Sequence, residues 1–97
     1  NGTINTSDES EKDIIGASPG LALVRAIQTF TFRFKDKPSL VHYGVGARQL
    51  GSLIAADVGV VRRFPDAPWG VNYGELTVPL IRAVQELDAR VRALEAR

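Results

Sequence analysis

The chain has 97 residues, a formal net charge of +1, no cysteine and a single histidine, His42. Its length suits one domain with a modest core, for which association of copies is a natural supplement. The near-zero charge gives no electrostatic reason to expect a nucleic acid or a membrane surface as partner, and no apolar run approaches the roughly 20 residues of a membrane span. Without cysteine, disulfides and thiolate metal sites are excluded, and one histidine argues against a protein-built zinc site, so we expect neither a metal nor another cofactor.

The first part of the chain is polar and rich in turn-forming residues over positions 1–12, which predicts an exposed lead-in. Methionine is absent even from the first position, and we therefore expect a fragment or a processed product. A helix is predicted over residues 21–27, with Ser18 as its N-cap and Pro19 at its first position.

The middle of the chain predicts a small antiparallel sheet. Residues 28–34 alternate strictly and place Phe30, Phe32 and Phe34 on one face of a strand. After a turn over residues 35–38, residues 40–45 are expected to return as a second strand. Residues 49–54 are expected to form a third short strand, and residues 55–64 a helix that stops before Pro65. The fold class is therefore α+β.

The last predicted element is a long helix. Its start lies at Asn72, which has capping-box spacing to Glu75, or at Thr77, shortly before Pro79. Five apolar residues then follow at steps of 4, 3, 4 and 3: Leu80, Val84, Leu87, Val91 and Leu94. This heptad seam favours association with copies of itself, although valine and leucine alone do not choose between two and three strands. The alternative is a surface helix that lies on its own domain.

Few side chains suggest chemistry. Ser7 and Lys12 would form a nucleophile–base pair only if a turn at residues 8–11 brought them together, and a solvated tail is the simpler interpretation. His42 is expected on a strand surface, Trp69 as a packing residue, and Arg62 and Arg63 at a solvated helix end. The glycines at positions 44, 46 and 51 do not follow the phosphate-loop pattern.

Four stretches together resemble one known family. They are residues 7–14 (Ser-Asp-Glu-Ser-Glu-Lys-Asp-Ile), residues 32–36 (Phe-Arg-Phe-Lys-Asp), residues 46–58 around Ala-Arg-Gln-Leu-Gly, and residues 71–76 continuing into 83–87. In this order they are similar to the C-terminal intramolecular chaperone domain of phage endosialidases, tail spikes and tail fibres, which also occurs in myelin regulatory factor proteins. The sequence differs from the family pattern at Leu50 and Ala56.

The resemblance implies a trimeric coiled coil and a self-cleaving serine endopeptidase. Ser7 would be the nucleophile, Lys12 its general base, and the Thr6–Ser7 peptide bond the cleavage site. The implied partners are two further copies of the chain and an upstream β-rich fibre domain, with no nucleic acid or membrane. The implied setting is a virion precursor that is assembled in the host cytoplasm.

The same resemblance divides the chain into three parts. Residues 1–6 would end the upstream fibre, residues 7–72 would form the globular chaperone and protease portion, and residues 73–97 would form the coiled-coil helix. Two alternatives stay open: a trimerisation cap that is not cleaved, and a coiled-coil module that binds a different partner.

Overall fold

The structure is a computed structural model and describes residues 4–97. Its elements in chain order are η1 (Glu9–Glu11), α1 (Leu21–Ala26), β1 (Thr29–Phe34), β2 (Lys37–Val45), α2 (Ala47–Gly51), β3 (Val61–Arg62), β4 (Gly70–Val71) and α3 (Tyr73–Glu95). The strands form two separate antiparallel sheets of two strands each, β1 with β2 and β3 with β4. The predicted α+β class with a long C-terminal helix is confirmed, whereas the predicted single sheet is wrong.

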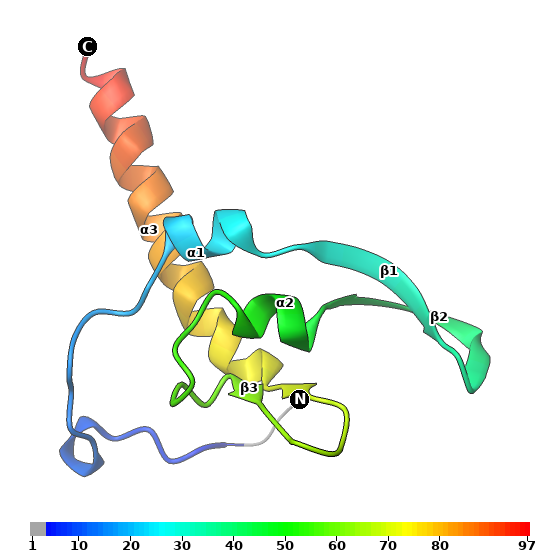
Figure 1. Cartoon of the computed structure of the whole chain (residues 1–97). Helices are drawn as coiled ribbons and strands as arrows, with labels where there is room; N and C mark the ends of the chain where they lie inside the picture. Colours follow the sequence, from blue (N-terminus) through cyan, green and yellow to red (C-terminus); the bar gives the residue numbers. More distant parts are fainter. Residues whose placement is uncertain (1–3) are drawn as a thin grey trace.

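The hairpin formed by β1 and β2 projects away from the helices (Figure 1). Phe32 lies opposite His42 in the register, and the two rings stack with centroids 5.3 Å apart. The register shifts between Phe32 and Phe34, and the extra residues lie on β2, between Lys37 and His42. The predicted common face of the phenylalanines is confirmed by edge-to-face contacts of Phe32 with both Phe30 and Phe34. Phe30 and Phe34 are exposed, so this face has little cover within the single chain.

The segment after the hairpin corrects two predictions. Residues 49–54 do not form a strand, because residues 47–51 form the short helix α2. The Gln49 side chain anchors this helix by accepting from the Gln28 backbone N–H and donating to the Ala26 carbonyl. Residues 55–64 do not form a helix either; turns lead into β3. Both segments are held by contacts with distant residues, which a local pattern does not reveal.

Arg63 organises the loop between α2 and β3. Its guanidinium donates to the carbonyl oxygens of Gly51 (2.8 Å), Ala56 (3.1 Å) and Ile54 (3.4 Å). The same guanidinium lies 5.5 Å from the centroid of the Trp69 ring. Arg63 is therefore a half-buried structural residue, and the expectation of a solvated helix end is wrong for it.

Helix α3 begins directly after Asn72, the earlier of the two predicted starts. Asn72 does not cap the backbone with its side chain; its amide Nδ2 instead donates to the Glu75 carboxylate at 3.2 Å. Pro79 lies inside the helix and is buried. The helix therefore continues through the proline instead of starting after it.

Helix α1 packs across α3, and its N-cap is Gly20, not Ser18 as predicted. The Ser18 hydroxyl donates to the Pro19 carbonyl and is not part of the cap. The Leu21 backbone N–H instead donates to the Glu86 carboxylate of α3 at 2.8 Å. Helix α1 is thus capped by a side chain from another element.

Little of the chain is buried in the single copy. The buried apolar residues among those described are Leu21, Leu50, Val60, Val61 and Ala83. The accessible surface is 8180 Å², whereas a compact monomer of 10.5 kDa exposes about 5,400 Å². The radius of gyration is 16.5 Å, compared with about 12.5 Å for a compact domain of this length. The exposed lead-in, the projecting hairpin and the protruding α3 all contribute to this open shape (Figure 1).

Candidate functional site

Ser7 and Lys12 are in contact. The Lys12 Nζ donates a hydrogen bond of 2.9 Å to the Ser7 Oγ. Five residues of extended chain would separate the two Cα atoms by about 17 Å. The contact therefore depends on a reversal of the chain between the two residues.

The 3-10 turn η1 provides that reversal. The Glu11 backbone N–H donates to the Asp8 carbonyl at 3.0 Å, and the Lys12 backbone N–H donates to the Glu9 carbonyl at 3.1 Å. The Asp8 carboxylate caps the turn by accepting from the Ser10 backbone N–H at 3.0 Å. The turn at residues 8–11, which was the condition for contact between Ser7 and Lys12, is present.

The hydrogen bonds of this cap lower the pKa of the Asp8 carboxyl. Hydrogen bonds from the Ser10 backbone N–H, and secondarily from the Ser10 hydroxyl, favour the ionised carboxylate and lower the pKa of Asp8 below its ordinary value of 3.8. The ionised carboxylate is therefore the form of Asp8 that the turn favours.

The arrangement is chemically incomplete in a single chain. Ser7 and Lys12 are exposed, as are the described residues on either side of them. A lysine acts as a general base only as the neutral amine, which burial or nearby positive charge favours. The pair thus has the required contact but not the enclosure that activates a serine nucleophile. Thr6, whose carbonyl precedes Ser7, is exposed, and residues 1–3 of the expected upstream segment lie outside the described residues.

The predicted seam on α3 forms a second candidate site. All five seam residues are exposed, from 44% at Leu87 to 64% at Val84. The face of α3 that contacts the rest of the chain is different and carries Pro79 and Ala83, which are buried. Residues 80 and 84 each follow a residue of that face, so the two faces are about 100° apart around the helix. The seam therefore does not pack against the rest of its own chain, as the alternative of a surface helix lying on its own domain would require.

The C-terminal part of α3 stands clear of the rest of the chain (Figure 1). Every described residue from 87 to 97 is exposed. The Arg92–Asp88 ion pair is exposed as well and adds at most about 0.5 kcal/mol. An isolated helical segment of this length is marginal in water, so this half of α3 gains from packing against another helix.

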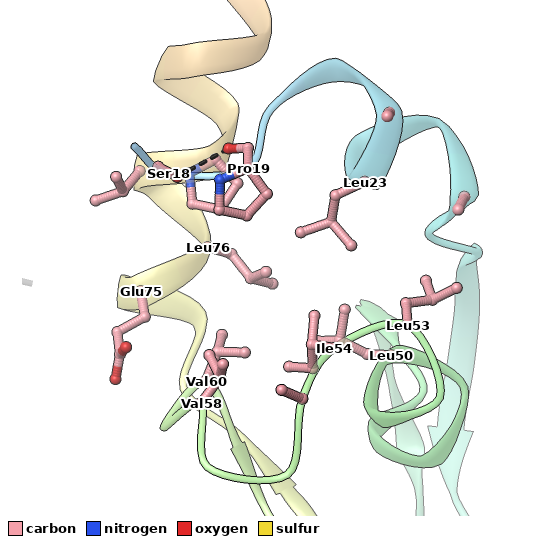
Figure 2. A pocket seen from close by; sticks show the side chains of 15 residues that line it. Ser18, Pro19, Leu23, Leu50, Leu53, Ile54, Val58, Val60, Glu75 and Leu76 are labelled. Carbon is pink, nitrogen blue, oxygen red and sulfur yellow. Dashed lines mark hydrogen bonds between the residues drawn. The ribbon is translucent and has the colours of Figure 1, made fainter. Parts of the chain in front are cut away.

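An apolar groove of about 710 Å³ lies between α1, the loop after α2 and the first turns of α3. Figure 2 shows Leu23, Leu76 and Ile54 around it, with Glu75 at its edge. The groove wall continues along α3 to Pro79, directly before the first seam residue. The groove therefore extends the apolar surface that the single chain leaves exposed.

The other candidates have structural roles. His42 is half-buried against Phe32 and Phe34 on the hairpin, which confirms its expected place on a strand. Trp69 packs against the core and beneath the Arg48 guanidinium, 4.4 Å from its ring centroid. Among residues 4–97, no group of three or more potential ligand side chains could hold a metal ion.

Two positions differ from the family pattern. Leu50 is fully buried at the centre of the core, with Val60 and Val61 beside it. The backbone carbonyl of Ala56 accepts one of the hydrogen bonds from Arg63. Both positions have structural roles away from the Ser7–Lys12 pair in this fold.

Comparisons with known proteins add no identification. No protein-family model, curated protein or solved structure matches the chain. In the described part of the chain, no helix is both long and apolar enough to cross a membrane.

Proposed function

We propose that this chain is an intramolecular chaperone that trimerises through α3, assists the folding of an upstream β-rich fibre and then releases itself by cleaving the Thr6–Ser7 bond. The proposed setting is a phage tail fibre or tail spike precursor. The observation that carries the cleavage step is the 2.9 Å contact between Lys12 Nζ and Ser7 Oγ, made across a capped turn. The exposed seam and the large accessible surface support the association of copies.

The proposed reaction begins with transfer of the Ser7 hydroxyl proton to the neutral Lys12 amine. The Ser7 Oγ then attacks the Thr6 carbonyl carbon, and a C–O bond forms as the Thr6–Ser7 C–N bond breaks. The proton held by Lys12 passes to the released Ser7 amine, which leaves an ester between Ser7 and Thr6. Water hydrolyses this ester and yields a Thr6 carboxylate and a chaperone that begins at Ser7.

The proposed association of three chains would help the upstream fibre to fold. Fibres rich in β-structure pair strands that are distant in sequence or on different chains, and such topologies fold slowly and aggregate readily. A small self-associating domain raises the effective concentration of the three fibre chains. Its removal after assembly leaves the fibre kinetically trapped. A neighbouring copy that covers residues 6–12 would also provide the enclosure that the single chain lacks.

The cleavage step is tested by intact-mass spectrometry of a longer chain that includes upstream fibre sequence. We expect a product that starts at Ser7 in the wild type, and an uncut chain for Ser7→Ala and Lys12→Ala. Lys12→Arg is a matched control because it keeps the positive charge but cannot deprotonate, and it should also stay uncut. Ser10→Ala removes a neighbouring hydroxyl and should still be cut. An uncut wild type would exclude the protease activity.

A second candidate is a trimerisation cap that stays attached to the fibre. The exposure of both Ser7 and Lys12 in the single chain favours it, because the pair lacks the enclosure that activates a serine nucleophile. This candidate predicts a trimer of intact chains. A third candidate, a coiled-coil module for another partner, predicts that the purified chain is a monomer.

A further inference from the structure

Asp8 joins the Ser7 side of the Ser7–Lys12 pair to the turn between them. It follows Ser7 directly and has an extended backbone, with φ −72° and ψ 129°. Its Oδ1 accepts from the Ser10 backbone N–H at 3.0 Å, and its carbonyl accepts from the Glu11 backbone N–H at 3.0 Å. Asp8 thus fixes both the entry into the turn and its first residues.

The turn has little other support. Turn η1 has three residues, and none of them is buried. Short helical turns of this kind are unstable by themselves because one or two hydrogen bonds do not repay the ordering of several backbone dihedrals. A capping carboxylate satisfies a backbone N–H that would otherwise have no intrahelical partner. The Asp8 carboxylate is therefore the side chain on which the reversal of the chain depends.

We propose that Asp8 is a positioning residue for the self-cleavage reaction: its carboxylate holds the turn that brings Lys12 to Ser7. This inference rests on the proposed function. Asp8 acts through the backbone of Ser10, and no contact of its side chain with Ser7 or Lys12 is required. Its negative charge is not required either, since asparagine is an equally good cap. The prediction is therefore specific to the acceptor oxygen.

The first test measures the rate at which the product starting at Ser7 forms from a chain with upstream fibre sequence. Asp8→Ala should slow cleavage by about fivefold, as expected for the loss of one N-cap. Asp8→Asn should restore the wild-type rate or exceed it. Glu9→Ala removes a carboxylate from the same turn that makes no cap, and should cleave normally. Wild-type cleavage by Asp8→Ala, or equal slowing by Asp8→Asn, would overturn the inference.

The second test is independent of cleavage. In chains that carry Ser7→Ala, nuclear Overhauser contacts are measured between the methyl at position 7 and the Lys12 ε-protons. We expect these contacts to weaken with Asp8→Ala and to persist with Asp8→Asn and Glu9→Ala. Unchanged contacts in Asp8→Ala would overturn the inference. If the wild type is never cut, the proposed protease function fails, and this second test still decides whether Asp8 positions the pair.

Discussion

The Leu21 backbone N–H donates a 2.8 Å hydrogen bond to the carboxylate of Glu86, 65 residues later in the chain. This bond fixes the start of α1 on the middle of α3. The N-cap of α1, Gly20, has no side chain of its own for this purpose, and a Cβ at that position would overlap the Glu86 carboxylate. A side chain at position 20 would therefore force the Glu86 side chain to move and would disturb its hydrogen bond with the Leu21 N–H.

Replacement of Glu86 should loosen the packing of α1 on α3. Glu86→Ala should lower the free energy of unfolding by about 1 kcal/mol, the usual contribution of a helix N-cap. Glu86→Gln keeps an acceptor oxygen and should lose less. The measurement is chemical denaturation of all variants at one protein concentration, because association of copies contributes to apparent stability. Equal losses for the two variants would contradict the role of the acceptor.

The cap of α1 by Glu86 also shows why part of the fold could not be predicted from local sequence patterns. Ser18 followed by Pro19 is a typical local start for a helix, yet the actual cap comes from a residue on α3. Local patterns correctly predicted the hairpin strands, since alternation of Phe30, Phe32 and Phe34 needs only neighbouring residues. They failed for residues 47–51, where the helix is anchored through Gln49 to the backbone of residues 26 and 28.

Arg63 should be important for the stability of the loop after α2. Arg63→Ala should lower the free energy of unfolding by about 2 kcal/mol, because the carbonyls that accept from its charged guanidinium lose their partner. Arg63→Lys keeps the charge but cannot reproduce the planar arrangement of donors, and it should recover only part of the loss. Chemical denaturation checks both values, with Arg62→Ala as a neighbouring exposed control. Full recovery by lysine would show that charge alone matters.

The stability of the turn at Asp8 should decrease at low pH. The folded state lowers the pKa of Asp8, because the Ser10 hydrogen bonds favour the carboxylate. The additional stabilisation that the ionised carboxylate gives the turn is therefore fully present above the ordinary value of 3.8, and this part is lost as the pH falls through the lower folded-state pKa. Nuclear magnetic resonance titration of the Ser10 amide should follow this loss. A Ser10 amide that does not respond below pH 4 would contradict the cap.

The sequence suggested the residues of the candidate site but did not predict the contact between them. Ser7 and Lys12 lie in a polar segment, and their spacing of five would separate them on a straight helix or strand. The motif at residues 7–12 suggested the pair, whereas the contact itself depends on the cap by Asp8. The seam was easier to predict, because a heptad pattern needs only one helix and appears directly in the spacing of its residues. The number of strands is a property of the assembly and is not fixed by this spacing.

The proposed chaperone and the proposed uncleaved cap both require self-association through α3, and multi-angle light scattering tests this association most directly. In chains that carry Ser7→Ala, the measured mass should be about 31.5 kDa, three times the 10.5 kDa of one chain. Leu87→Asp places a charge in the seam and should reduce the mass toward that of a monomer. Ala89→Asp, on the opposite side of the heptad, should leave the trimer intact. A mass of 10.5 kDa for the chain without seam substitutions would contradict the account.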